Sequence, residues 1–220
     1  MCAINRGLAL REMMFDLNVN GYNYLDKRTI EMFGGKGDWH LHELIKFVDP
    51  DLLDVCEIRN DFTKELVKKF PRSNVLNLDS LSYCQSEFTL SNSYELIVID
   101  NPQGVYGGDN LYCEHFEAII YALNAASDSV SIIFNINTSP FDLEKDLVWL
   151  HSRKNFYSSV GIDCIDGKGD LDVNNIEIFY RSIFNKNGYI VDKFRMYSRF
   201  SDHKKSVDYL HYGFISATRR

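Results

Sequence analysis

Three acidic side chains each close a short apolar run, where a strand of the chain would end. They are Glu57, Asp79 and Asp100. A carboxylate can accept hydrogen bonds from a diol or an amino group, and it can orient or deprotonate a nucleophile. Because a charged acceptor forms stronger hydrogen bonds than a neutral one, we regard these acids as candidates for ligand binding and catalysis.

A glycine-rich segment follows a fourth acid, Glu31. The sequence from that residue reads Glu-Met-Phe-Gly-Gly-Lys-Gly-Asp and includes Gly34, Gly35 and Gly37. Glycine allows a tight turn between a strand and a helix, and it lets a ligand approach the backbone closely. The segment is therefore a candidate for cofactor binding.

A polar cluster begins at Asp100 and continues as Asn101, Pro102 and Gln103, with Tyr106 close behind. An amide oxygen can hold an amino group, and an aromatic ring can stack on a base. We interpret the first two residues as candidate catalytic groups and the others as candidate substrate-binding groups.

The elements that position these residues are predicted from hydrophobic periodicity. Apolar and β-branched runs alternate with amphipathic helical patterns, which is typical of parallel βαβ units. The predicted strands cover residues 28–33, 52–57, 74–78, 94–99, 129–136, 189–196 and 209–217. The predicted helices cover residues 39–48, 61–70, 111–126 and 175–187. In such sheets ligands lie outside the carboxyl ends of the strands, which is where the acids and the glycines fall.

Five strands alternating with helices, followed by a helix and two last strands, resemble the class I SAM-dependent methyltransferases over residues 29–216. The resemblance implies an α/β fold, a three-layer Rossmann-like sheet of seven mostly parallel strands with the last strand antiparallel. It divides the chain into an N-terminal helical cap at residues 1–27 and a Rossmann domain at residues 28–220. Residues 140–169 match no predicted element, and we interpret them as a region that carries substrate specificity.

The same resemblance assigns roles to the candidate residues, with S-adenosylmethionine as the cofactor. Glu31, Gly34, Gly35 and Gly37 would hold its methionine part, although Phe33 replaces the first glycine of the family motif. Glu57 would hold the ribose and Asp79 the adenine, with Asp100 also close to the cofactor. Asp100 and Asn101 would orient or deprotonate the acceptor, and Pro102, Gln103 and Tyr106 would contact it.

Two other functions stay open from the sequence. The glycine-rich segment, the pair Glu57-Ile58 and residues 107–116 resemble the polyamine aminopropyltransferases of the spermidine synthase type. These enzymes use decarboxylated S-adenosylmethionine, and Asp100 would then help to deprotonate the attacking amine. The second alternative is a methyltransferase-like binding subunit without catalysis, because a fold does not fix a function.

Charge and cysteine usage limit the partners. The formal net charge is −7, but the residues from Arg181 onward carry nine Lys and Arg against three Asp and Glu, a net of +6. We expect a small-molecule or nucleic-acid acceptor, and in the basic region we expect aromatic side chains to point inward and charges outward. The five cysteines are scattered, which predicts a reduced, cytoplasmic protein with Cys56 and Cys164 in its core.

Neither metals nor membranes are expected partners. The six histidines form no set of metal ligands in the sequence, and His40 and His42, two positions apart on a helix, would face different directions. We expect most of them at the surface, with His115 a weaker candidate for the site. No apolar run reaches the roughly 18 to 20 residues that a membrane span needs. The oligomeric state stays open, a homodimer included.

Overall fold

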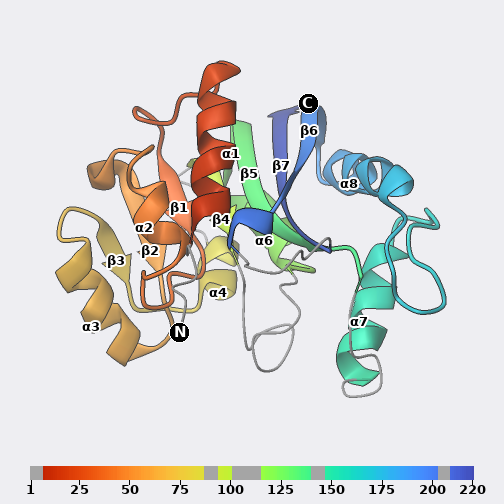
Figure 1. Ribbon diagram of the computed structural model, residues 1–220, viewed down its shortest axis with the longest axis horizontal. Helices are drawn as coiled ribbons and strands as arrows, with labels where there is room; N and C mark the ends of the chain where they lie inside the picture. The colour runs from red at the N-terminus through yellow and green to blue at the C-terminus, as the bar shows by residue number, and fades with distance from the viewer. Residues whose placement is uncertain (1–6, 87–93, 101–114, 140–146, 203–208) are drawn as a thin grey trace.

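The seven strands of the chain form a single sheet in the computed structural model, which describes residues 7–86, 94–100, 115–139, 147–202 and 209–220 (Figure 1). The strands are β1 (Thr29–Glu31), β2 (Leu53–Cys56), β3 (Asn74–Leu76), β4 (Tyr94–Ile99), β5 (Ala126–Asn137), β6 (Tyr189–Ser198) and β7 (Leu210–Arg219). Their order is β3-β2-β1-β4-β5-β7-β6, and β7 runs antiparallel to both of its neighbours. This order confirms the predicted fold class.

The described helices include those that the sequence predicted and two, α4 and α7, that it did not. They are α1 (Leu8–Val19), α2 (His40–Leu44), α3 (Asn60–Lys69), α4 (Ser80–Gln85), α6 (Ala118–Ala125), α7 (Leu147–Tyr157) and α8 (Val173–Lys186), with short 3₁₀ helices η1 (Pro50–Leu52) and η2 (Phe200–Asp202). The side chain of Asp172 accepts a hydrogen bond from Asn174 N at the start of α8. Gly188 follows α8 with φ of 83°, a conformation that suits glycine after a helix.

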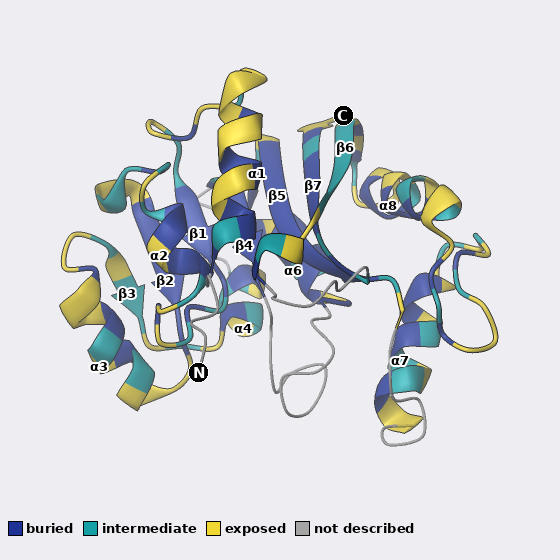
Figure 2. Ribbon diagram, viewed as in Figure 1, coloured by how far each residue is buried: buried dark blue, intermediate teal, exposed yellow. Residues whose placement is uncertain are grey.

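Two hydrophobic cores lie on the two faces of the sheet. Buried side chains of α1, α2 and α3 pack on one face, and those of α4, α6, α7 and α8 pack on the other. The strand β4 contributes Leu96 and Val98 to the first core and Ile97 and Ile99 to the second, which explains its continuous apolar sequence. Figure 2 shows the buried strands between helices whose outer faces are exposed. Cys56 and Cys164 are buried, as predicted.

The helix α1, predicted as part of a helical cap, packs against α2 and η2. It buries Leu10, Met13 and Leu17, which lie three or four positions apart and so share one face of the helix. The predicted helix over residues 111–126 begins only at Ala118 within the described residues. Among the described helices, none has both the length and the apolar character needed to cross a membrane.

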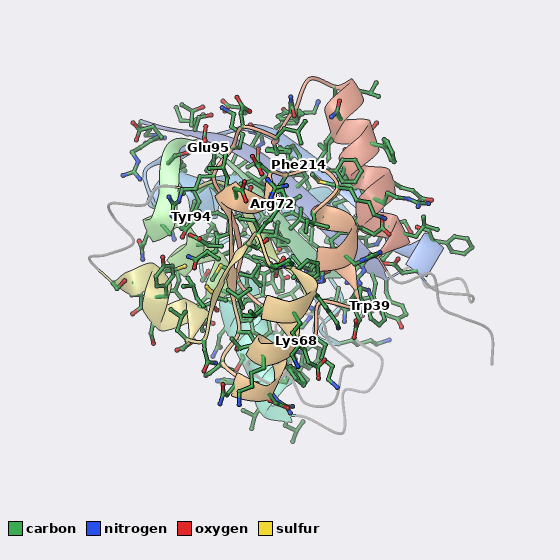
Figure 3. All side chains as sticks on the ribbon, turned by 90° about the vertical axis from the view of Figure 1, so that its left-hand side faces the viewer. Trp39, Lys68, Arg72, Tyr94, Glu95 and Phe214 are labelled. Carbon is green, nitrogen blue, oxygen red and sulfur yellow. The ribbon has the colours of Figure 1, made fainter. Side chains whose placement is uncertain are left out.

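A polar cluster around the buried Asp54 carboxylate holds the amino ends of neighbouring strands together. The carboxylate of Asp54 in β2 accepts hydrogen bonds from Arg28, Asn74 and the Tyr94 hydroxyl. Figure 3 shows Tyr94 and Glu95 on the opposite side of the molecule from Trp39, which directly precedes α2. The amino edge of the sheet is therefore fixed by its own contacts, and the predicted site residues belong to the other edge.

Candidate functional site

The carboxyl ends of β1, β2 and β4 meet at the point where the strand order reverses. The chain runs from β1 outward to β2 and β3, and then returns to the other side of β1 with β4. In the register of the sheet, Glu31 pairs with Val55 and with Val98, so that Glu57 and Asp100 each follow two residues beyond a partner of Glu31. The fold therefore brings Glu31, Glu57 and Asp100 to the crevice where open α/β sheets bind ligands.

The glycine-rich turn lies against β2 and α3 through close backbone contacts. The Gly34 amide donates to the Cys56 carbonyl at 2.9 Å, and a Cβ at Gly34 would lie 2.5 Å from the Val55 side chain. Gly37 has φ of +70°, and a Cβ there would lie 2.4 Å from the Phe70 ring. These two glycines are required by packing and backbone conformation. Gly35 also has positive φ, but open space surrounds its Cβ position, so it is the glycine that a ligand can approach.

The carboxylate of Glu57 joins the end of β2 to this turn. Its Oε2 accepts the Gly35 amide at 2.8 Å and its Oε1 accepts the Arg59 amide at 2.7 Å. Burial raises the pKa of Glu57, and the two backbone donors oppose that rise. Asn77 fixes the same segment, because its Nδ2 donates to the carbonyls of Glu57 and Ile58. The adjacent Ile58 side chain is 68% exposed, which leaves an apolar surface beside the carboxylate.

A buried histidine lies between the two remaining acids. His40, the first residue of α2, has its Nε2 2.9 Å from Glu31 Oε2 and its Nδ1 2.9 Å from Asp100 Oδ2. All three side chains are buried, and Glu31 also accepts the Phe33 amide at 3.1 Å. The two carboxylates raise the pKa of His40 to about 10, against the effect of burial. Burial raises the pKa of Glu31, and the facing imidazole opposes that rise.

Asp100 receives two further donors from the end of the chain. Arg199, which follows β6, donates to Oδ1 at 3.2 Å, and the Tyr212 hydroxyl of β7 donates to Oδ2 at 2.7 Å. With His40, these groups hold the pKa of Asp100 well below its usual range despite burial. A carboxylate held in this way is a poor proton acceptor, so deprotonation of an acceptor by Asp100 does not fit its surroundings.

The series of contacts between charged groups continues from Arg199 to the N-terminal helix α1. Arg199 Nε lies 3.6 Å from Asp202 Oδ2, and Asp202 Oδ1 accepts the Ala9 amide in the first turn of α1 at 3.0 Å. The orphan amides at a helix N-terminus and the helix dipole both favour a carboxylate at this place. Alternating cations and anions therefore link α1, η2, Asp100 and the end of β1.

The structure places the other predicted residues less centrally or does not describe them. Asp79 is exposed at the start of α4, where it accepts the Leu81 amide at 3.1 Å and the Ser82 hydroxyl at 2.7 Å. Asn101, Pro102, Gln103 and Tyr106 lie outside the described residues.

One expectation about charged residues was wrong, since Arg199 is buried although charges of the basic region were expected to point outward. His40, for which the sequence predicted no role, is buried at the site. His115 is buried in the opposite core, where its Nε2 lies 2.7 Å from the Tyr180 hydroxyl. Burial lowers its pKa to about 3, so it is a neutral core residue. The one sequence signal that could have identified His40 is its position directly after the glycine-rich turn.

No group of three or more His, Cys, Asp or Glu side chains in the described part of the chain is arranged to hold a metal ion. The space between Glu31 and Asp100 is occupied by the imidazole of His40.

Neither a protein-family model nor a curated protein sequence matches the chain, but solved structures do. M. jannaschii TYW2 in complex with AdoMet is 12% identical with a TM-score of 0.60, over 100% of this chain and 79% of TYW2. A putative RNA methyltransferase from Pyrococcus horikoshii is 11% identical with a TM-score of 0.51, over 96% of this chain and 84% of the other.

Magnesium protoporphyrin IX methyltransferase from Synechocystis PCC 6803 with bound SAH is 12% identical with a TM-score of 0.50. The match covers 97% of this chain and 84% of that enzyme. At these identities the likeness concerns the backbone, and it agrees with the strand order and the antiparallel β7. The chain therefore has the fold of the class I SAM-dependent methyltransferases.

Proposed function

We propose that the chain binds S-adenosylmethionine at the carboxyl ends of β1 and β2 and transfers its methyl group to an acceptor beside β4. The observation that carries this proposal is the Glu57 carboxylate, which is fixed at the strand switch point against Gly35, the glycine of the glycine-rich turn that has open space around its Cβ position. Structural neighbours that contain AdoMet or SAH support the same cofactor.

Glu57 can hold a ribose without losing its present contacts. A carboxylate has about four acceptor positions, and the amides of Gly35 and Arg59 use one on each oxygen. The two positions that remain suit the two hydroxyls of a ribose diol, as charge-assisted hydrogen bonds. The exposed Ile58 side chain offers an apolar surface to the adenine ring, and Asp79 stays the proposed partner of the adenine amino group.

Methyl transfer needs an aligned nucleophile more than a strong base in this geometry. The three donors to Asp100 keep it ionised, so we assign it an orienting and electrostatic role next to Asn101. Holding the nucleophile and the methyl group in line supplies much of the rate of such a transfer. The same contacts disfavour the aminopropyltransferase alternative, because that reaction would use Asp100 as a proton acceptor. The acceptor stays a small molecule or a nucleic acid.

Calorimetric titration with S-adenosylmethionine, S-adenosylhomocysteine and decarboxylated S-adenosylmethionine tests the proposal. We expect the first two to bind, and we expect Glu57→Gln to weaken them about 10-fold to 100-fold, since a hydrogen bond to a charged group contributes about 1.5–3 kcal/mol. Glu65 is a half-exposed acid of α3, and Glu65→Gln is the matched control that should leave affinity unchanged. Preference for the decarboxylated compound would favour the aminopropyl reaction. Binding of none of the three would contradict both enzyme functions.

A further inference from the structure

His40 lies where the glycine-rich loop ends and α2 begins. The glycine-rich loop leaves β1 after Glu31 and enters α2 at His40, so residues 32–39 are enclosed between these two. The contact between Glu31 Oε2 and His40 Nε2 at 2.9 Å closes the loop at its base. The contact between His40 Nδ1 and Asp100 ties the same base to the end of β4.

The surroundings of the imidazole bear on its protonation. Each ring nitrogen faces a carboxylate oxygen at 2.9 Å, and an ionised carboxylate can only accept a hydrogen bond. Two carboxylates at this distance favour the doubly protonated imidazolium, which would be a buried cation between two acids. Charged or titratable groups reach this cluster from β1 (Glu31), from the end of β4 (Asp100), from the segment after β6 (Arg199 and Asp202) and from β7 (Tyr212).

The two acids have few positions left for a ligand. Asp100 accepts from His40, Arg199 and Tyr212, and Glu31 accepts from the Phe33 amide and faces His40. Both carboxylates are almost completely buried, with exposed fractions of 0% for Glu31 and 1% for Asp100. A cationic group of a ligand that approached either acid would therefore compete with His40 for it.

We propose that His40 is a positioning residue, an imidazolium that fixes the base of the glycine-rich loop to the ends of β1 and β4, with Glu31 and Asp100 as its anchors. Glu57 fixes the tip of the loop through Gly35, so the loop is held at its base and at its tip before a ligand arrives. The methionine part of the cofactor is then left to the loop backbone and not to the Glu31 carboxylate. This last step rests on the proposed function. The clamp itself, by which we mean the contacts of His40 with Glu31 and Asp100, does not.

Nitrogen NMR of the histidine side chains in the wild-type chain tests the clamp directly. At pH 8, Nδ1 and Nε2 of His40 should both carry protons, whereas an ordinary histidine with a pKa of about 6.5 is neutral. The exposed His42 is the internal reference, and His40→Gln assigns the signal. The doubly protonated state should persist when S-adenosylhomocysteine is added. A neutral His40, or one released by the ligand as its ammonium group takes over the acids, would overturn the proposal.

Ligand affinities separate positioning from a general effect on folding. In His40→Gln we expect the affinity for S-adenosylhomocysteine to fall about tenfold, because the loop loses its anchor. The affinity for 5′-methylthioadenosine, which lacks the amino-acid part, should stay unchanged, and His42→Gln should change neither. An equal loss for both ligands, or no loss for either, would contradict the positioning role.

Failure of the proposed function gives a different pattern of results. If the wild-type chain binds neither ligand, the cofactor assignment fails, and the clamp is still tested by NMR and by hydrogen exchange. The Gly35 amide should then exchange faster in His40→Gln than in the wild type and in His42→Gln, because a loosened loop opens more often. Unchanged exchange at Gly35 would overturn the positioning role on its own.

Discussion

At the scale of single residues, Arg199 separates two buried carboxylates that would otherwise repel each other. It contacts Asp100 and Asp202, and its guanidinium lies over the Tyr212 ring at 4.6 Å. Removing one member of a buried ion pair leaves an uncompensated charge and costs about 3–5 kcal/mol. We expect Arg199→Met to lower the free energy of unfolding by about that amount in urea titrations.

The control for this variant is Arg72→Met. Arg72 contacts Asp49 and Asp51 at the surface, where solvent weakens ion pairs, so its loss should change stability little. Equal effects of the two substitutions would show that burial of the Arg199 cluster is not what stabilises it.

The pH dependence of folding follows from the raised pKa of His40. Its pKa of about 10 lies above the ordinary value, so the folded chain holds a proton that the unfolded chain releases. The stabilisation is complete below about pH 6.5 and is lost as the pH rises through 10. We expect the free energy of unfolding to fall between pH 7 and 10 with a slope of up to about 1.4 kcal/mol per unit.

A comparison of variants separates the contribution of His40 to this slope from the contributions of lysines and tyrosines, which also ionise in this pH range. His40→Gln should show a shallower decline than the wild type, whereas His42→Gln should keep the wild-type slope. If all three chains lose stability in parallel above pH 7, His40 is not the group responsible.

The identities of the strand-end acids could be predicted at this scale, but their partners could not. Glu31, Glu57 and Asp100 follow apolar runs, so their common edge follows from the strands alone. Arg199 and Tyr212 lie 99 and 112 residues from Asp100, and no local pattern links such distant positions. A sequence also contains no signal that tells a buried arginine from the exposed ones around it.

At the scale of elements, the pairing of β5 with β7 depends on a glycine. Gly213 pairs with Phe134, and a Cβ at Gly213 would lie 2.6 Å from that ring. Overpacking of a buried contact costs about 1–3 kcal/mol, so Gly213→Ala should lower the free energy of unfolding by that amount. Gly167→Ala, which has open space and no positive φ, is the control and should have little effect. A neutral Gly213→Ala in urea titrations would contradict this account.

The elements themselves were largely predictable because their patterns are local. The buried run of β4 and the glycine after α8 appear in the sequence at the observed positions. The start of α6 at Ala118 was missed, because helical periodicity continues upstream through residues 115–117, which are not helical; residues 111–114 lie outside the described chain. The helix α7 lies in the region that was left without an element, since its charged and aromatic residues give little helical periodicity.

At the scale of the whole molecule, cofactor binding should stabilise the folded chain by mass action. A ligand at a hundred times its dissociation constant adds about 2.7 kcal/mol to the free energy of unfolding. For a chain of 220 residues we expect a rise in melting temperature of about 5–10 °C with S-adenosylhomocysteine. Scanning fluorimetry measures it, and Glu57→Gln should show a smaller rise at the same concentration. A rise that is as large in the variant would place the ligand away from Glu57.

The contact between Asp202 and the Ala9 amide joins positions 193 residues apart, near the two ends of the described chain. During synthesis on a ribosome, α1 leaves the exit tunnel long before its buried partner Asp202 has been made. Until then Asp100 also lacks Arg199 and Tyr212, two of its three donors. We therefore expect a nascent chain to complete the site only after β7 has been made, and truncation before Arg199 to deprive both α1 and Asp100 of these partners.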